Sequence, residues 1–241
     1  AAPTARERTQ TIASGRVGAQ LGPAPGVTLK GHLGWHCRPP NFYELFGDRG
    51  AVKGNPALKR EHGQDWDAGL SWQPPATGST RLLLEAVYFD NQVDDLIRFI
   101  QNAQRVSVAH NIGSSRVRGL ERRGDLSLPA RLRLAGTDSY QVPANQTDAA
   151  YERGKDLPNA PRHTVNGQTA WAPGPWQFEY QLSHESRHYL DRANLRTVAA
   201  RTIHGVQARR RLGGGLEAGL EVRNLTDNQI ADLWGYPLPG R

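Results

Sequence analysis

The sequence predicts an all-β fold, an antiparallel up-and-down meander that forms part of a transmembrane β-barrel. Three observations predict it. Apolar and polar residues alternate with a period of two in many segments, which gives a strand one apolar and one polar face. Glycine and proline, with 26 and 16 residues among 241, supply many turns. Short and long connections between the alternating segments follow one another in strict alternation along the chain.

The alternation defines the expected strands. In the segment 27–35, for example, the apolar residues Val27, Leu29, Leu33 and Trp35 are separated by polar or small ones. We expect ten strands, at 8–21, 27–37, 64–73, 80–91, 112–126, 130–140, 162–172, 176–187, 201–212 and 215–224. Their lengths of about 8–15 residues exceed those of most strands in soluble proteins. They suit strands that cross a bilayer at a tilt.

Short and long connections follow one another strictly. The short ones are 22–26, 74–79, 128–130, 172–175 and 213–215; the long ones are 38–63, 92–111, 141–161 and 188–200, followed by the tail from 225. In an antiparallel meander this order places all tight turns at one end and all long loops at the other. Outer-membrane barrels have this asymmetry, with the long loops outside the cell. A soluble β-sandwich with uneven loops is the alternative fold.

The stretch RPPNFYELFGDRGAVKGNPALKREH, residues 38–62, is the longest connection. It is too long and polar for a turn, and its prolines and glycines interrupt it too often for a helix. We therefore expect an irregular loop on the outer face, where a receptor meets its ligand.

Composition narrows the class of protein. The net charge of +7 comes mostly from arginines scattered along the chain, which suits an anionic lipid surface and argues against a nucleic-acid partner. Cys37 is the only cysteine, so the sequence offers no internal disulfide and no thiolate metal site. No run approaches the roughly 18 apolar residues of a transmembrane helix. The chain has no signal peptide and no methionine, and we interpret it as a processed or excised piece.

Some expected apolar faces carry polar residues. Asn166 and Gln168 share a face with Thr164 and Ala170, and Arg210 follows Val206 and Ala208. Such side chains are costly at the bilayer midplane but tolerable near an interface or in a barrel lumen.

The segment HESRH, residues 184–188, matches the His-Glu-x-x-His motif of zinc proteases. That motif works on a helix, where both imidazoles reach one metal and the glutamate is the general base. Here the alternation from Trp176 to Leu182 indicates a strand, which would place His184 and His188 about 13 Å apart. We expect no metal site, no cofactor and no enzyme; a zinc hydrolase that uses His184, Glu185 and His188 is the alternative function.

Five ordered segments resemble one known family. RPPNFYELFGDRG followed by GNPALKREH is similar to the paired loop motifs of TonB-dependent outer-membrane receptors. The matching positions are Arg38, Pro40, Glu44, Leu45, Asn55, Pro56, Leu58 and Glu61, with Arg60 where the family usually has proline. LEAVYFDNQVDDLIRF (84–99), NIGSSRVRGLE (111–121), EVRNLTDNQ (221–229) and GYPLPGR (235–241) resemble later family motifs in the right order.

The resemblance implies a partial barrel. It covers residues from about 8 to the end, and we expect 1–241 to be the C-terminal portion of the receptor barrel, with the plug domain and the final strand absent. The family's barrel has 22 strands, so ten strands would leave two open edges.

The resemblance also implies a function. The whole receptor would lie in the bacterial outer membrane, in contact with outer-membrane lipid. It would bind an iron chelate, haem or cobalamin on its long loops and import it through a plug that contacts the TonB complex. Within the loop at 38–62, the candidate ligand-binding residues are Arg38, Phe42, Tyr43 and His62. A soluble binding module derived from a barrel is a further alternative.

Overall fold

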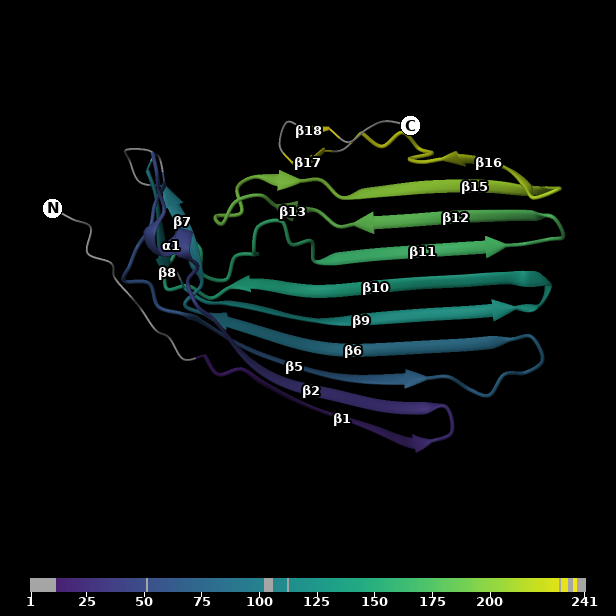
Figure 1. Cartoon of the computed structure of the whole chain (residues 1–241), viewed down its shortest axis with the longest axis horizontal. Helices are drawn as coiled ribbons and strands as arrows, with labels where there is room; N and C mark the ends of the chain where they lie inside the picture. Colours follow the sequence, from purple (N-terminus) through teal and green to yellow (C-terminus); the bar gives the residue numbers. More distant parts are fainter. Residues whose placement is uncertain are drawn as a thin grey trace.

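The computed structural model describes residues 12–50, 52–101, 106–111, 113–229, 231–233 and 236–237. Ten long strands form one antiparallel sheet in the order β1-β2-β5-β6-β9-β10-β11-β12-β15-β16 (Figure 1). Their bounds are Gly15–Ala24, Val27–Arg38, Glu61–Trp72, Arg81–Asp94, Ser115–Leu128, Leu132–Asn145, His163–Trp171, Trp176–Glu185, Arg201–Gly213 and Leu216–Val222. The predicted all-β meander of ten strands is confirmed, and each strand pairs with its neighbours along the chain.

Two strand ends differ clearly from the prediction. β1 continues to Ala24, so the first turn contains only Pro25 and Gly26, whose φ of +73° suits glycine. Residues 8–11 of the predicted strand lie outside the described residues, and 12–14, also predicted as strand, precede β1, which begins at Gly15. β10 runs to Asn145, five residues beyond the predicted end, because its whole length pairs with β9.

The two ends of the sheet differ as predicted. The five tight connections lie together at one end and the long ones at the other (Figure 1). The β9–β10 turn is a short 3-10 helix, Pro129–Arg131, in which Ala130 and Arg131 have positive φ. The β15–β16 turn uses Gly213, Gly214 and Gly215, all with positive φ.

The first two long connections are folded. They contain α1 (Phe42–Phe46), β3 (Asp48–Arg49), β4 (Val52–Lys53), β7 (Ile97–Gln101) and β8 (Ser107–Asn111). A second sheet with the order β3-β4-β8-β7 joins them, and its β4–β8 pair is parallel. We call this unit, residues 39–60 and 95–111, the loop lobe. Further along the chain, β13 (His188–Tyr189) pairs with β14 (Thr197–Val198), and β17 (Ala231–Leu233) pairs with β18 (Tyr236–Pro237).

The expectation that 38–62 contains no helix is wrong. Asn41 caps α1: its side chain accepts a hydrogen bond from Glu44 N at 2.8 Å, and the Glu44 carboxylate accepts one from Asn41 N at 2.8 Å. This reciprocal capping box allows a helix of one turn directly after Pro39 and Pro40. Pro40 and Gly47 therefore lie just outside the two ends of the helix and do not interrupt it.

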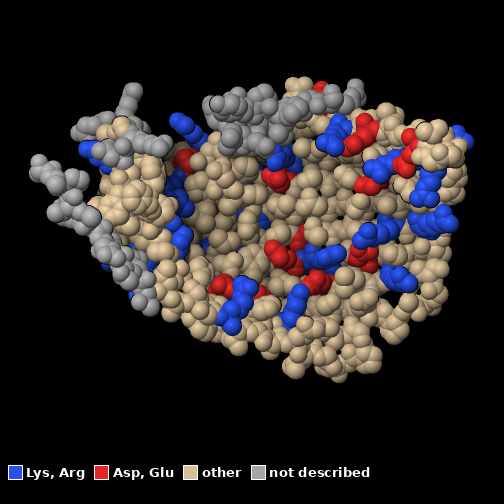
Figure 2. Space-filling model, viewed as in Figure 1, with Lys and Arg blue, Asp and Glu red and all other residues tan. Residues whose placement is uncertain are grey.

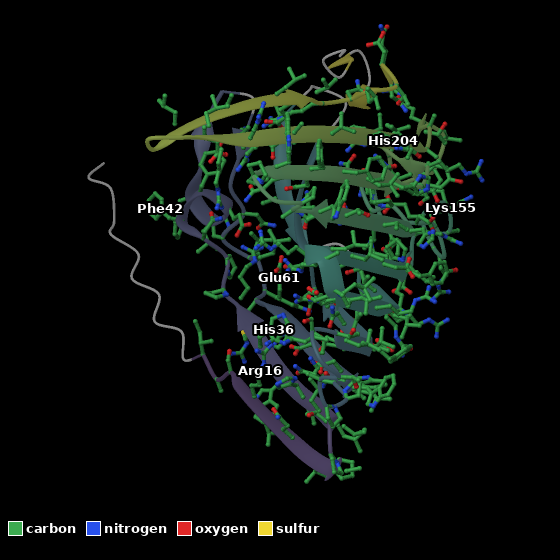
Figure 3. The ribbon with its side chains drawn as sticks, turned by 90° about the vertical axis from the view of Figure 1, so that its right-hand side faces the viewer. Arg16, His36, Phe42, Glu61, Lys155 and His204 are labelled. Carbon is green, nitrogen blue, oxygen red and sulfur yellow. The ribbon has the colours of Figure 1, made fainter. Side chains whose placement is uncertain are left out.

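The register of the sheet separates side chains into two sets, because directly opposed residues share a face. One set contains large hydrophobic side chains that are exposed: Leu29, Leu33, Trp35, Trp66, Leu70, Trp72, Leu84, Tyr88, Leu134, Tyr140, Trp171, Trp176, Phe178, Tyr180 and Leu220. Figure 3 shows the sheet curved into a trough, with Arg16, His36 and Glu61 on its inner, concave side and His204 on its outer, convex side. Since His204 is opposite Leu182, the hydrophobic set forms the convex face.

The buried apolar core lies in the loop lobe and not under the sheet. Leu45 of α1, Leu58, Ile97 of β7 and Ala109 of β8 form one buried cluster. Leu58 is 1% exposed. Among the described residues no helix is long and apolar enough to cross a membrane.

We expect Leu58→Ala to unfold the loop lobe selectively. Removing a fully buried leucine side chain costs about 2–5 kcal/mol. Limited proteolysis of the detergent-solubilised protein should show faster cleavage within 39–60, while the strands of the main sheet stay protected. Leu195→Ala, at a leucine that is 83% exposed, is the matched control and should leave the cleavage pattern unchanged. Equal cleavage of both variants would contradict the assigned core.

Candidate functional site

The concave face carries most of the polar and charged side chains of the sheet. Seen from this side, acidic and basic residues lie interspersed across the surface (Figure 2). The space along β1 to β10 is lined by residues such as Arg16, Lys30, His32, Asp65 and Glu121. A polar concave face opposite an apolar convex one is the arrangement of a barrel wall with a water-filled interior.

Ion-paired side chains cross the concave face between β1 and β6. His32 Nδ1 lies 3.0 Å from Asp67 Oδ1, and His36 Nδ1 lies 3.3 Å from Asp65 Oδ1. Arg16 reaches the same Asp65 at 3.6 Å, and Lys30 pairs with Glu85. The aspartates orient both imidazoles, so this part of the face is a rigid, mixed-charge surface.

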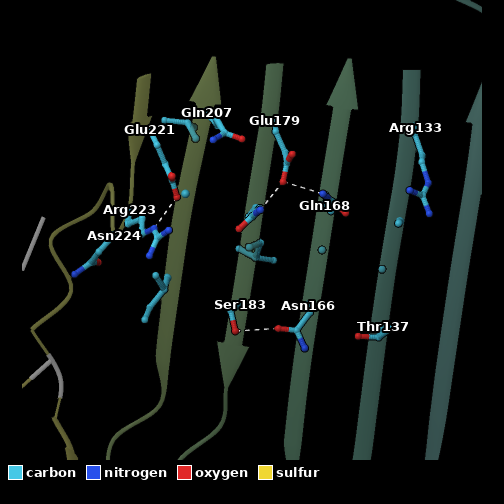
Figure 4. A pocket seen from close by; sticks show the side chains of 18 of the residues that line it. Arg133, Thr137, Asn166, Gln168, Glu179, Ser183, Gln207, Glu221, Arg223 and Asn224 are labelled. Carbon is cyan, nitrogen blue, oxygen red and sulfur yellow. Dashed lines mark hydrogen bonds and ion pairs between the residues drawn. The ribbon is translucent and has the colours of Figure 1, made fainter. Parts of the chain in front are cut away.

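Amide and carboxylate groups continue this pattern over β9 to β16 (Figure 4). Gln168 Nε2 donates to Glu179 Oε1 at 2.8 Å, and Ser183 Oγ donates to Asn166 Oδ1 at 3.0 Å. Asn166 and Gln168 thus lie on the polar face and do not interrupt the apolar one. Arg210 does lie on the convex face, but at the tight-turn end, where its guanidinium stands 5.0 Å from the centre of the Trp176 ring.

The loop lobe is fastened to the rim of the sheet by Arg38. Its Nε donates to Glu61 Oε2 at 2.6 Å, and its Nη1 donates to both Glu44 oxygens at 3.1 Å. Glu61 Oε1 also accepts the backbone N–H of Ile97 at 2.7 Å. One guanidinium therefore joins β2, β5 and α1, and Glu61 extends the connection to β7.

Two asparagines complete the attachment of the loop lobe. Asn55 Nδ2 donates to the carbonyl of Ala109 at 3.0 Å. Asn111 Oδ1 accepts from Lys59 N at 2.8 Å, and its Nδ2 donates to the carbonyls of Lys59 and Asp95. These bonds hold the segment before β5 against the β7–β8 hairpin, and the two long connections form one body.

The other two long connections are also joined. Asn194 Oδ1 accepts from Asp156 N at 2.8 Å, and the Asp156 carboxylate holds Arg162, whose pKa it raises through hydrogen bonds. Burial raises the pKa of Asp191, but the backbone N–H groups of Arg196, Leu195 and Ala193 outweigh it and lower that pKa overall. These capped turns give the end of the sheet that carries the long connections a fixed shape.

Aromatic rings are exposed on the loop lobe. Phe42 is 79% exposed and stacks obliquely on Phe46, with ring centres 5.4 Å apart. Tyr43 packs against Phe99 at 5.7 Å. Exposed aromatics on a rigid body suit recognition of a ligand, since they lose little entropy on binding.

The four predicted ligand-binding residues do not come together. Arg38 is occupied by Glu44 and Glu61, so its contacts hold the loop lobe. Phe42 and Tyr43 are exposed on α1. His62 follows Glu61 on β5 and opposes Cys37, so its side chain projects from the convex face, opposite Arg38.

The His-Glu-x-x-His segment is not helical. His184 and Glu185 end β12, whereas His188 begins β13. His184 Nδ1 lies 2.8 Å from Thr202 Oγ1, and Glu185 pairs with Arg201 at 3.0 Å. Among the described residues no three His, Cys, Asp or Glu side chains converge as a metal site. The strand predicted at 176–187 is confirmed from Trp176 to Glu185, where it ends two residues before the predicted end.

Sequence reasoning missed the residues that organise the rim. Glu61 and Asn111 matched family motifs, but nothing in their local pattern indicated that their partners would be Ile97 N and Lys59 O. The His32–Asp67 and His36–Asp65 pairs also went unpredicted. A signal was available, because both histidines and both aspartates lie on the polar face of expected strands.

Comparison with known protein families gives a match over most of the chain. A model described as "TonB dependent receptor-like, beta-barrel" matches residues 2–225. Comparison with curated protein sequences finds no match.

Solved structures show the same fold. A copper transporter, OprC, is 20% identical with a TM-score of 0.76, covering 97% of this chain and 39% of OprC. A mutant ferric enterobactin receptor, PfeA from Pseudomonas aeruginosa, is 20% identical with a TM-score of 0.72, covering 94% and 38%. The siderophore receptor PiuA from Acinetobacter baumannii is 18% identical with a TM-score of 0.73, covering 90% and 32%. The chain thus spans less than two fifths of the length of these structures.

We expect Arg38→Lys to release the loop lobe from the sheet. A lysine ammonium cannot hold two carboxylates with the planar fork of arginine, and Glu44 and Glu61 would repel each other. The free energy that holds the loop lobe on the sheet should fall by about 2 kcal/mol, which is the typical contribution of hydrogen bonds to charged groups. Hydrogen exchange measured on peptides covering 41–60 should become faster.

The control is Arg133→Lys on the concave face. Arg133 pairs with Asp125 but remains largely exposed. This substitution should therefore change the free energy of local opening, as reported by hydrogen exchange, by less than about 1 kcal/mol. Unchanged exchange over 41–60 in Arg38→Lys would show that the guanidinium does not hold the lobe.

Proposed function

Because the chain belongs to the TonB-dependent receptor β-barrel family, we propose that it is the C-terminal portion of the barrel wall of an outer-membrane receptor. The whole receptor captures an iron chelate, haem or cobalamin on its outer rim and imports it. Import is driven by the TonB complex through a plug domain carried elsewhere in the protein. The chain itself contributes a wall and part of the rim.

The observation that carries this proposal is the separation of the two faces of the sheet. Large hydrophobic side chains are exposed on the convex face from β2 to β16, which is stable where lipid covers it. The concave face carries Arg16, His32 and Asp67 over β1 to β5 and continues polar to β16. Lipid against the convex face and water against the concave face give each set of side chains a favourable environment.

The edges of the sheet support a wall that continues on both sides. Within the described part of the chain β1 pairs only with β2, and β16 pairs only with β15. Unpaired backbone N–H and C=O groups each cost several kcal/mol in hydrocarbon. Further strands of the receptor pair with β1 and β16 and close the barrel.

The ligand meets the end of the barrel that carries the long connections. The loop lobe presents Phe42 and Tyr43 there on a body that is held by Arg38, and the capped turns around Asp191 shape the neighbouring rim. The structural relatives are described as a copper transporter and as ferric enterobactin and siderophore receptors. Their descriptions support a metal or metal chelate as the cargo.

The two other functions fit the structure less well. A zinc hydrolase would need His184 and His188 on one helical face, whereas they lie on two different strands. A soluble binding module would have to keep residues such as Trp66, Leu70 and Leu84 in water. Neither accounts for the separation of the two faces.

The first test concerns the membrane. All tryptophans in the described residues lie on the convex face: Trp35, Trp66, Trp72, Trp171 and Trp176. We expect lipids with brominated acyl chains to quench their fluorescence in the reconstituted receptor, and aqueous iodide to quench it weakly. Strong quenching by iodide with none by brominated lipid would contradict the proposed orientation.

The second test concerns the ligand. The probes are ferric enterobactin, haem and cyanocobalamin, added to the membrane-inserted receptor that contains this chain. Phe42→Ala combined with Tyr43→Ala should weaken binding of the cognate probe about tenfold, because two aromatic contacts contribute about 0.5–1.5 kcal/mol each. Tyr151→Ala, at an exposed tyrosine of another long connection, is the control and should bind normally. Failure of all three probes to bind the unaltered receptor would contradict the proposed cargo.

A further inference from the structure

The convex face carries a group of arginines where lipid is expected. From the end with the long connections, the convex positions of β9 are Arg116, Arg118, Leu120 and Arg122. Charged side chains on the lipid side of a barrel cost free energy that grows toward the bilayer midplane. We call these three guanidinium groups the arginine patch.

Carboxylates of neighbouring strands position two of the three arginines. Arg116 Nε donates to Asp90 Oδ1 at 2.8 Å, and Asp90 itself is 4% exposed. Arg122 pairs with Asp138, which also holds His163 Nε2. The acids lie beneath the guanidinium groups, which remain partly exposed on their outer side.

Arg118 differs from both. It opposes Asp90 in the register but is exposed, and no acidic partner is found for it in the described part of the chain. The arginine patch therefore has three guanidinium groups for two carboxylates. Its unbalanced positive charge points outward and is complementary to an anion.

Aromatic residues indicate the depth of the arginine patch in the membrane. Leu120 lies directly between Tyr88 on β6 and Tyr140 on β10. Tyrosine and tryptophan rings collect at the level of the lipid headgroups. Arg118 and Arg116 lie on the water side of this row and Arg122 lies one position on the bilayer side, so the patch spans the headgroup zone.

An apolar groove is lined along one side by Arg122 and Asp138. It runs over the convex face, where Leu70, Trp72, Leu84 and Val165 contribute to its walls. Its floor is formed by Gly124, Gly136 and Gly167, which oppose one another on three adjacent strands.

These glycines are not required by the backbone. None of them has a positive φ. An added Cβ would come no closer than 3.5 Å at Gly124, 3.4 Å at Gly136 and 3.8 Å at Gly167. Larger residues would fit the strands, and their absence keeps the groove open.

We propose that the arginine patch and this groove bind one phosphate-bearing membrane lipid. The phosphate lies on Arg118, with Arg116 at the neighbouring convex position of β9, since guanidinium forks bind phosphate oxygens in pairs. Arg122 is two convex positions from Arg118, beyond Leu120, and lines the groove. One acyl chain lies in the groove over the glycine floor. A site for an anionic head beside an apolar groove at headgroup depth fits a lipid better than a membrane protein. The inference rests on the proposed function, because the convex face must lie in a bilayer.

The test uses the receptor in phosphatidylcholine nanodiscs with added dioleoyl phosphatidic acid, and native mass spectrometry to count retained lipid. Arg118→Gln removes the unpaired charge without leaving an acid unpaired, and we expect about tenfold weaker retention. Arg210→Gln removes an arginine from the same face at the tight-turn end and should retain the lipid normally. Equal retention by Arg118→Gln and the unaltered receptor would overturn the headgroup site.

Gly167→Leu tests the groove. It should weaken retention of dioleoyl phosphatidic acid severalfold but leave the short-chain dihexanoyl lipid unaffected. Gly205→Leu, with similar room on the concave face, is the control. Loss of both lipids or of neither would overturn the acyl-chain assignment, and a copurifying protein that replaces the lipid would favour a protein contact.

Quenching by brominated lipid separates this proposal from the proposed function. If the convex tryptophans are quenched but Arg118→Gln retains the lipid, only the lipid site is wrong. If no quenching occurs, the membrane orientation itself is wrong.

Discussion

The structure depends on one constraint: the eight inner strands of the sheet each pair on both sides in a fixed register, β1 and β16 pair on one side, and side chains alternate between two faces. Once that register is set, every residue of the ten long strands is assigned to the convex or the concave face. A shift of one residue would exchange Leu84 with Glu85 and move charge into the apolar face. The cross-strand pairs His32–Asp67 and Gln168–Glu179 reinforce the register from the concave side, and Trp66–Tyr88 does so from the convex side, with ring centres 5.3 Å apart.

The same register also positions the residues that hold the loop lobe at the end of the sheet. Arg38 and Glu61 are the last and first residues of β2 and β5, and they oppose each other directly. Their pairing places two oriented groups at the end of the sheet, on which Glu44 of α1 and the backbone of Ile97 dock. The loop lobe thus docks on the Arg38–Glu61 pair that ends β2 and begins β5. This answers why the chain uses so many residues between β2 and β5: they form a folded unit with its own core, and that unit holds aromatic rings in place.

Much of this organisation was predictable from the sequence. Alternation predicted the ten strands, and the order of connection lengths predicted the two ends of the sheet, because both follow from local geometry. The sequence did not predict features that depend on which residues pair with each other. Residues Val87, Tyr88 and Phe89 are apolar in succession, and only the partners of β6 show that Tyr88 faces outward. The helix at 42–46 depends on the reciprocal bond between Asn41 and Glu44, which the surrounding prolines and glycines obscured.

The arrangement of the faces can be measured along β6. Single cysteines would replace residues 84 to 89 in a Cys37→Ser background, and each would carry a spin label in the reconstituted receptor. The register predicts that collisions with oxygen, which concentrates in lipid, peak at positions 84, 86 and 88 and fall at 85, 87 and 89. A profile without a period of two, or with its maxima at the odd positions, would contradict the assignment of the convex face to lipid.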